Sequence, residues 1–349
     1  MYSIKIADRV IGKKHPPLFL PEIGTFFNQD INLAKELIEN LVASGAEMIK
    51  GEILHNVDIA LDVEFTAEYY SSKKGVIRER YRDLIARKVV PLSHYEEIFG
   101  FCRSENVPFI LSVYDFEGAT FARDIGASAI KIASSNIVHH PLIEFVSKLG
   151  LPIIMDTGCS TFAEISRAVE WLRSSGCSDL LIEHSPAAPP APASSQNLRI
   201  LRTFQDAFSA PVGLSDHYHG NEMLYIAIAL GAGLLEKGVM PSGGGDEQDA
   251  SHAMPIRQVK EVIECCAACY ESLGAPTKPA PQSGHPARMG LVASRDLREG
   301  DTIDLTNVSF AWPAIGIGVE HWKLVVGSKI IGTINKGQIV DWKNVLVNS

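Results

Sequence analysis

The sequence of 349 residues has no long hydrophobic run: its apolar stretches all fall well short of the roughly 18 consecutive residues that cross a bilayer. It has no basic excess either, because 32 lysines and arginines stand against 41 aspartates and glutamates, giving a formal net charge of −9. The first absence argues against a membrane-spanning protein, and the second against a nucleic-acid binder, which needs a basic face. Residues 1–15 alternate charged and apolar side chains, unlike a signal peptide. We therefore expect a cytoplasmic protein.

Two short motifs are also missing. The sequence has six cysteines, but the CxxC formed by Cys266 and Cys269 has no second pair, so reduced thiols on a helix are favoured over a zinc site. No GxGxxG follows the first predicted strand, which argues against an open, doubly wound nucleotide-binding sheet. With 46% hydrophobic and 21% charged residues, the chain nevertheless has enough apolar side chains for a full globular core.

The sequence does contain a repeated unit: a short apolar run, turn residues and then an amphipathic segment such as 31–46 or 161–176. Continuous apolar runs are typical of parallel strands, whose two faces are both covered. Eight such runs alternating with helices predict a (β/α)8 TIM barrel in the α/β class. The predicted strands are residues 18–24, 46–53, 108–114, 129–134, 152–158, 180–185, 211–217 and 233–239.

Three segments depart from this repeat. Residues 54–90 form a long insertion after the second strand, which predicts either a solvated helix face or a cover over the site. Residues 274–287 are rich in proline, glycine and serine and indicate a linker. Residues 288–349 turn to short strands and glycine turns, which predicts a small all-β domain. The expected organisation is therefore a barrel domain at 1–273, the linker, and this small domain.

Polar side chains cluster at the carboxyl ends of the predicted strands, where barrel enzymes place their active sites. Charged groups there are costly to bury unless they are paired or bind a ligand. One Lys–Glu pair could simply close the barrel, but a charge at the end of every strand except the third favours an anion-binding active site. Phosphate or carboxylate ligands and a divalent ion or acid–base role at His217 with Glu22 are the chemistry expected. The anion-binding candidates are Lys50, Lys131, Ser134, Thr157 and Ser215.

Several of these segments together resemble one family. PEIG (21–24), GAEMIKGE (45–52), IKIASS (130–135), HPLI (140–143), DTG (156–158), GLSDH (213–217) and ALGAGLLEK (229–237) occur in its order. The chain resembles the sialic acid synthase family: N-acetylneuraminate synthases and relatives for legionaminic, pseudaminic and spore-coat sugars, including the spore coat polysaccharide biosynthesis protein E type. Residues 291–303 and 327–340 resemble the family's antifreeze-like (SAF) domain.

The resemblance implies a transferase. It would join the methylene carbon of phosphoenolpyruvate to the aldehyde of an open-chain N-acylated amino hexose, giving a 2-keto-3-deoxy sugar acid for a surface or spore-coat-type polysaccharide. A divalent metal, Mn or Mg, would polarise the aldehyde, with His217 as a ligand. Glu22 would contact the acceptor sugar, and a homodimer would form in which each SAF domain closes the partner's barrel. The residues implied to hold phosphoenolpyruvate are Lys50, Ser112, Lys131, Ser134 and Ser215, and Glu22, Lys50 and Lys131 are the implied catalytic groups.

Five positions depart from the family pattern, mainly in its metal and acceptor half. The second metal-binding histidine of the family corresponds to Gly238, and its Asn-His pair corresponds to Phe26 and Phe27. A glutamate after the fourth strand corresponds to Asn136, and an arginine of the SAF domain corresponds to Trp312. These departures indicate an altered acceptor and an altered or lost metal.

Two alternatives to a synthase therefore stay open. One is a pseudo-synthase that binds sugar or phosphoenolpyruvate without turnover, as Gly238, Asn136 and Trp312 suggest. The other is an aldolase that forms a Schiff base on Lys131, which lies at a strand end inside the predicted barrel. A phosphate-binding lysine is the simpler interpretation of Lys131.

Overall fold

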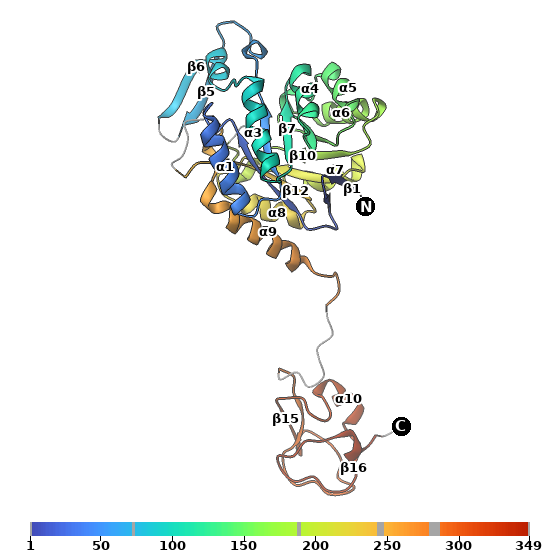
Figure 1. Ribbon diagram of the computed structural model, residues 1–349. Coiled ribbons are helices and arrows are strands. Elements are labelled where there is room, and N and C mark those ends of the chain that lie inside the picture. The colour runs from blue at the N-terminus through green and yellow to red at the C-terminus, as the bar shows by residue number, and fades with distance from the viewer. Residues whose placement is uncertain (1, 72–73, 187–189, 243–247, 279–286, 348–349) are drawn as a thin grey trace. The chain divides into compact units, whose positions relative to one another are not determined.

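The computed structural model describes residues 2–71, 74–186, 190–242, 248–278 and 287–347 (Figure 1). The chain divides into two compact units, residues 1–274 and 275–349, and each is considered by itself. Most of the predicted linker 274–287 falls on residues 279–286, which lie outside the described residues. No described helix is both long and apolar enough to cross a membrane.

The first unit is the predicted eight-stranded parallel barrel. Each strand pairs with the next strand of the barrel, and the last pairs with both its predecessor and the first, so the sheet closes on itself. A further short strand, β13 (Met254–Pro255), pairs with the end of the eighth barrel strand. The barrel strands are β3 (Leu18–Gly24), β4 (Ile49–Ile53), β7 (Phe109–Val113), β8 (Ala129–Ile132), β9 (Ile153–Asp156), β10 (Leu180–His184), β11 (Val212–Ser215) and β12 (Leu234–Met240).

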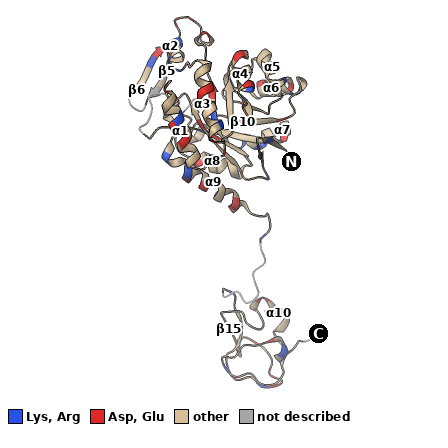
Figure 2. Cartoon of the chain, in the orientation of Figure 1, with Lys and Arg blue, Asp and Glu red and all other residues tan. Residues whose placement is uncertain are grey.

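A helix follows each barrel strand, as the repeat predicts. Local sequence fixes several starts: the Asp30 carboxylate accepts hydrogen bonds from two backbone amides of the first helix, and Thr161 and Glu164 form a capping box at the fifth. The helices contain charged residues of both signs, as Figure 2 shows for α1 and α9. The helices are α1 (Ile31–Ala43), α3 (Leu92–Ser104), α4 (Phe116–Asp124), α5 (His140–Ser147), α6 (Phe162–Ser174), α7 (Ile200–Phe208), α8 (Glu222–Ala229) and α9 (Val259–Leu273).

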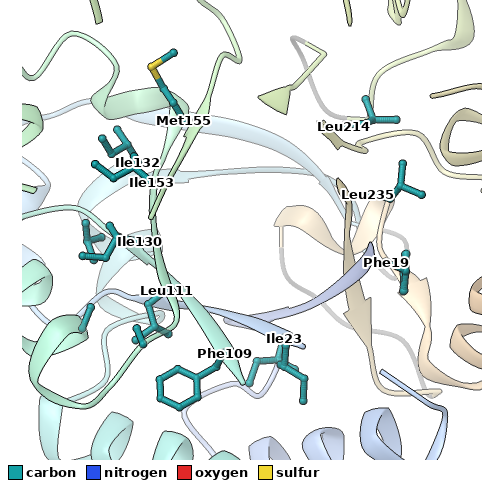
Figure 3. Close-up of a cluster of buried hydrophobic side chains, with 14 of the residues drawn as sticks. Phe19, Ile23, Phe109, Leu111, Ile130, Ile132, Ile153, Met155, Leu214 and Leu235 are labelled. Carbon is teal, nitrogen blue, oxygen red and sulfur yellow. The ribbon is translucent and has the colours of Figure 1, made fainter. Parts of the chain in front are cut away.

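Side chains alternate between the two faces of the barrel strands, as the two-residue period of a strand requires. The outward-facing set packs against the helices and forms the main core (Figure 3); on β7 and β8 it includes Leu111, Ile130 and Ile132. The inward-facing set divides into two layers. Near the amino ends it is apolar, and near the carboxyl ends it is almost entirely charged or polar.

An amino-terminal hairpin closes the apolar end of the barrel, and the sequence analysis did not predict it. Its strands β1 (Ser3–Ile6) and β2 (Arg9–Gly12) pair antiparallel. The alternation of residues 1–15 buries Ile4, Ile6 and Ile11 against the lower layer of the barrel interior, where they cluster with residues such as Leu181 and Leu234. The charged residues of the same segment are left on the outside.

The insertion 54–90 is mainly a hairpin, not the helix face that one interpretation expected. Strands β5 (Thr66–Ser71) and β6 (Gly75–Arg80) pair antiparallel, and the short helix α2 (Tyr81–Ala86) follows. β5 contacts the segment Gln248–Ser251, which follows β12, and the Lys88 ammonium lies 3.7 Å from the Asp249 carboxylate. The insertion therefore packs against a loop at the carboxyl end of the barrel.

The second unit has a small core of its own. Its strands are β14 (Gly290–Ala293), β15 (Val308–Ala311), β16 (Lys329–Ile330) and β17 (Val345–Leu346), paired antiparallel as β14–β15 and β16–β17. One short helix, α10 (Trp322–Val325), adds to the predicted strands. Eleven aliphatic side chains are buried together among the described residues of this unit, including Leu291, Ile303 and Val340. Trp312, which directly follows β15, is 64% exposed in this unit.

Candidate active site

The carboxyl ends of the barrel strands surround a cavity of about 190 Å³. Its wall contains all but one of the candidate residues: Glu22, Lys50, Ser112, Lys131, Ser134, Ser215 and His217 lie together there. Thr157 does not line the cavity, and its hydroxyl donates a hydrogen bond of 2.8 Å to the backbone carbonyl of Glu183. The strands place these groups because alternate residues of each strand point inward at the same level.

Lys50 on β4 is buried among three carboxylates. Its ammonium group donates a hydrogen bond to Glu22 on β3 and lies 3.5 Å from Glu236 on β12 and 3.8 Å from Glu52. Burial, only partly offset by Lys50, raises the pKa of Glu22 to about 8. Burial opposes the charge of Lys50, but Glu22 and Glu236 outweigh it and raise the pKa of the lysine. Near neutral pH the pair is thus a protonated Glu22 beside an ammonium group.

Lys131 on β8 forms a second, deeper cluster. Its ammonium group lies 2.5 Å from Glu236, 2.8 Å from Glu183 and 3.1 Å from Asp156. Burial and the neighbouring Glu236 raise the pKa of Glu183 to about 8 despite Lys131. Burial would also raise the pKa of Asp156, but Lys131 and His217 outweigh it and lower that pKa. The carboxyl groups around Lys131 therefore differ in pKa: that of Glu183 is raised and that of Asp156 is lowered. Catalytic sites that need both an acid and a base show the same separation of pKa values.

The wall of the cavity is more acidic than an anion-binding site requires. Among the described residues that line it, three lysines, Lys50, Lys131 and Lys237, face more carboxylates than they can neutralise. The lysines at the strand ends predicted an anion site, but each of them is already paired with a carboxylate. The lining carboxylates are Glu22, Glu52, Asp156, Asp216, Glu236 and Asp249.

Lys237 holds the loop that carries His217. Its ammonium group is buried, lies 2.6 Å from the Asp216 carboxylate, and donates hydrogen bonds to the backbone carbonyls of Tyr218 and Gly220. Burial lowers the pKa of Lys237, and it raises the pKa of Asp216. A lysine that is satisfied by a carboxylate and two carbonyls fixes the backbone after β11, so the direction of the His217 side chain is set from beneath.

The hydroxyl groups of the cavity occupy different positions. Ser215 donates a hydrogen bond of 3.0 Å to Glu236 and lies 3.4 Å from the Lys131 ammonium. Ser112 is buried at the end of β7, and Ser134 begins the 3₁₀ turn Ser134–Asn136. Ser134 also lies against Gly158, where an added Cβ would come within 3.1 Å of its side chain. Both Ser112 and Ser134 line the cavity.

Three further lining residues were missed in the sequence. Tyr114 follows β7 and hydrogen-bonds Glu52, and burial raises its pKa well above the usual value. Asp249 and His252 lie in the loop after β12, and the His217 and His252 rings have centroids 4.7 Å apart. Burial, then His217, lowers the pKa of His252 to about 3. The signal available was position: loops at the carboxyl ends of barrel strands carry site residues.

The four departing positions that lie in the barrel unit make defined contacts in the structure. Phe27 is buried in the main core, and Phe26 packs on Ala250 and Ala253. The Asn136 amide donates a hydrogen bond to the Val113 carbonyl, tying the turn after β8 to the end of β7. Gly238 lies under the Phe26 ring, so an added Cβ would come within 3.0 Å of it.

A closed (β/α)8 barrel with a charged cavity at its carboxyl end, followed by a small, mainly β unit, defines the class of protein. The model of the NeuB family matches residues 37–278, and that of the SAF domain matches residues 288–346. The chain therefore belongs to the NeuB family, and the fold predicted from the sequence, a TIM barrel followed by a SAF domain, is confirmed.

The chain is similar along its length to several known proteins. It is 30% identical to an uncharacterized protein of Methanocaldococcus jannaschii, over 99% of each chain. It is 26% identical to an N,N'-diacetyllegionaminic acid synthase of Campylobacter jejuni, covering 89% of this chain and 94% of that one. In structure it resembles the spore coat polysaccharide biosynthesis protein SpsE of Bacillus subtilis, with a TM-score of 0.67, 23% identity, and 99% and 100% of the two chains covered.

Proposed function

We propose that this protein is a condensing synthase that joins phosphoenolpyruvate to an N-acylated amino hexose and makes a sialic-acid-like 2-keto-3-deoxy acid for polysaccharide biosynthesis in the cytoplasm. The observation that supports it most is the cavity that brings Lys50, Lys131, Ser112, Ser134 and Ser215 together at the carboxyl end of a NeuB-type barrel. The names of relatives, an acid synthase and a spore coat polysaccharide protein, support the same product class.

The reaction needs one proton delivered and one removed. The methylene carbon of phosphoenolpyruvate attacks the aldehyde carbon of the sugar, and the aldehyde oxygen takes up a proton to become a hydroxyl group. Water then attacks the cationic carbon, which still carries the phosphate group, and loses a proton. Phosphate leaves from this carbon as the keto group forms. Glu22, whose pKa is raised to about 8 by burial, is the proton donor we assign to the aldehyde oxygen. Asp156, held ionised by Lys131, is the assigned acceptor of a proton from water.

The donor set of the cavity fits a divalent metal. His217 lines the cavity beside carboxylates, and a buried imidazole nitrogen of His252 has no hydrogen-bond partner among the described residues. His217 would hold the ion, which when bound supplies Lewis-acid polarisation of the aldehyde. The protein side chains then orient the acceptor and exclude water from the lower barrel.

Phosphoenolpyruvate is an anion, so an acidic cavity must change its protonation to bind it. Glu22 and Glu183 are already largely protonated near neutral pH, so Lys50 and Lys131 can turn to the ligand only if Glu236, whose pKa the two lysines hold below the usual value against the effect of burial, takes up a proton. We therefore expect binding of phosphoenolpyruvate to take up protons. Calorimetric titration in buffers of different ionisation enthalpy, with Mn²⁺ and then with chelator, measures this uptake and the metal dependence together.

The test of the synthase is product formation. Purified protein, Mn²⁺, phosphoenolpyruvate and a panel of N-acylated amino hexoses should release phosphate and yield a nine-carbon 2-keto acid by mass spectrometry. Lys50→Met should abolish release, whereas Lys148→Met, which breaks only an exposed pair with Glu144, should leave it unchanged. Absence of phosphate release with every acceptor would contradict the proposal.

A pseudo-synthase is the second candidate, because the cavity carries more carboxylates than its lysines neutralise. It would bind phosphoenolpyruvate in the calorimeter without releasing phosphate with any acceptor. A Schiff-base aldolase is disfavoured by the surroundings of Lys131. Burial opposes its charge, but Asp156, Glu183 and Glu236 hold its pKa well above the usual value, whereas a Schiff-base lysine must lose its proton. Borohydride with pyruvate should therefore leave Lys131 unmodified.

Each active site of this synthase would be completed by a second copy of the chain, in a homodimer with exchanged SAF domains. The support is the resemblance stated above and the exposed Trp312 of the SAF unit. Mixing Lys50→Met with Trp312→Ala protein and letting subunits exchange should restore activity, because some dimers then hold one intact pair of barrel and SAF surface. No restoration, or a monomer by light scattering, would contradict the dimer.

A further inference from the structure

Two imidazoles face each other at the mouth of the barrel. His217 follows β11, His252 lies in the loop after β12, and their ring centroids are 4.7 Å apart with the ring planes inclined by 51°. Both side chains line the cavity. His252 is only 4% exposed, and its Nδ1 atom has no hydrogen-bond partner among the residues that the structure describes. A buried ring nitrogen without a hydrogen-bond partner is costly unless a ligand completes it.

The fold holds His252 in this place by backbone and packing contacts. β13, two residues further on, pairs with the end of β12, with Val239 opposite Met254. The His252 backbone N–H donates a hydrogen bond to the Asp249 carbonyl. Phe26 packs on Ala250 and Ala253, which flank His252 in the loop. The backbone that carries His252 is thus held in place before and after this residue.

The same packing closes the alternative position. An added Cβ at Gly238 would come within 3.0 Å of Phe26 Cε2 and 3.1 Å of Phe26 Cζ. Even the Cβ of a larger residue at position 238 would require the Phe26 ring to shift by a few tenths of an ångström. Phe26 fills the space beside Gly238 and at the same time supports the segment that carries His252. One aromatic side chain accounts for both the missing imidazole and the new one.

We propose that His217 and His252 together bind a first-row divalent transition metal, with water or substrate oxygens completing its coordination. No group of three or more His, Cys, Asp or Glu in the described ranges is arranged to hold a metal, so the protein supplies two ligands. Imidazole ligands suit first-row transition metals such as Fe²⁺ or Zn²⁺ better than Mg²⁺, which prefers oxygen. The inference deepens the proposed function, on which its catalytic meaning rests, by relocating the second metal ligand to the loop after β12.

Direct metal binding tests the assignment without substrate. Titration of the full-length protein with Mn²⁺, followed by loss of the free-ion electron paramagnetic resonance signal, should show one ion per chain. His217→Ala and His252→Ala should each weaken binding by more than about tenfold, since loss of even an indirect partner of a metal ligand costs roughly that much. His219→Ala is the matched control: His219 lies two residues further along the same loop, is exposed and does not line the cavity. Equal affinity of His252→Ala and the unmodified protein would overturn the inference, as would binding of Mg²⁺ as tight as that of Mn²⁺.

A conservative variant guards against misfolding. His252→Gln keeps a polar side chain of similar size, and electron spin-echo spectra of bound Mn²⁺ should show two coordinated imidazole nitrogens in the unmodified protein and one in His252→Gln. Thermal unfolding with chelator present should match between the two proteins. Two imidazole nitrogens in both would show that His252 is not a ligand.

These outcomes are distinct from those of the synthase test. A protein that binds Mn²⁺ through both imidazoles but releases no phosphate with any acceptor keeps this inference and loses the proposed synthase. A protein that makes the keto acid while His252→Ala binds Mn²⁺ normally keeps the synthase and loses this inference.

Discussion

The interior of the barrel is divided into two layers that are built by the same strands. On β10, Leu181 and Glu183 both point inward, two residues apart, and both are fully buried. Leu181 lies in the lower layer with the isoleucines of the amino-terminal hairpin. Glu183 lies in the upper layer, 2.8 Å from the Lys131 ammonium. One rise of about 7 Å along a strand therefore separates an apolar plug from an ionic cluster.

The two layers contribute to the protein in opposite ways. The lower layer gains free energy from removing apolar surface from water and closes the barrel at one end. The upper layer costs desolvation energy that its ion pairs only partly return, so stability does not explain why charges are gathered there. Their cost is a reason to assign them a function, and the contrast between Leu181 and Glu183 can be tested directly.

The largest effect is expected from removing the central cation of the upper layer. Lys131→Met leaves Asp156, Glu183 and Glu236 without their shared ammonium group, and the free energy of unfolding should fall by about 3–5 kcal/mol. Urea denaturation at neutral pH measures this. Lys148→Met, which removes an exposed partner of Glu144, should change stability by less than about 1 kcal/mol. A loss as small for Lys131 would mean that its carboxylates take up protons without cost.

A loss of similar or smaller size is expected in the lower layer. Leu181→Ala opens a cavity in a fully packed plug and should destabilise the protein by about 2–5 kcal/mol. Leu273→Ala is the control, because that leucine, at the end of α9, is 48% exposed and should change stability by no more than about 0.5 kcal/mol. If Leu181→Ala and Leu273→Ala unfold at the same urea concentration, the buried lower layer contributes less to the free energy of unfolding than its burial indicates.

Much of the fold could be predicted from the sequence because the barrel repeats one pattern eight times. Each outward face needs apolar residues such as Leu111 and Ile130, so the strands stand out as apolar runs. The hairpin at residues 3–12 was harder, because four-residue strands carry a weak signal. The insertion 54–90 was predicted only in part. Its length indicated a separate structure, but the alternation of residues 75–80, which form β6, was not distinguished from a helical pattern.

The site could be located from the sequence, but its charge state could not. Strand ends identified Glu22, Lys50 and Lys131, yet their pairing depends on register between strands that are distant in the chain. Lys131 and Glu236 are 105 positions apart and lie 2.5 Å from each other. His252 could not be predicted as a site residue for the same reason. The pairing of β13 with β12 places its loop beside His217, and this pairing is not visible in the sequence. Distances across a barrel are a property of closure and not of any one segment.

A sharper comparison of the two layers replaces Glu183, the upper-layer residue of β10, by leucine, the residue type found at position 181 in the lower layer. Glu183→Leu removes one of three carboxylates around Lys131, which keeps Asp156 at 3.1 Å and Glu236 at 2.5 Å. Burial raises the pKa of Glu183 to about 8, so near neutral pH this side chain is mostly uncharged and its replacement by leucine takes no ionised partner from Lys131. Urea denaturation should therefore show no loss, in contrast to Leu181→Ala. A loss above about 2 kcal/mol would show that Lys131 requires all three partners.

The smallest effect, a change of slope with pH, follows from the protonated carboxyls. The pKa of Glu22 and of Glu183 rises from 4.5 to about 8 in the folded protein, so between these values the folded state holds protons that the unfolded state has released. Stability then falls as pH rises from about 5 to 8, by at most about 1.4 kcal/mol per pH unit for each group. Glu183→Leu should flatten the fall between pH 6 and 8 by up to one such increment, measured by urea denaturation at several pH values. Glu144→Gln should leave the slope unchanged, because Lys148 lowers the pKa of Glu144 and this carboxyl is ionised in both states throughout that range. Parallel slopes for the unmodified protein and Glu183→Leu would mean that Glu183 is already ionised beside Lys131, and the upper layer would then bear a full set of buried charges.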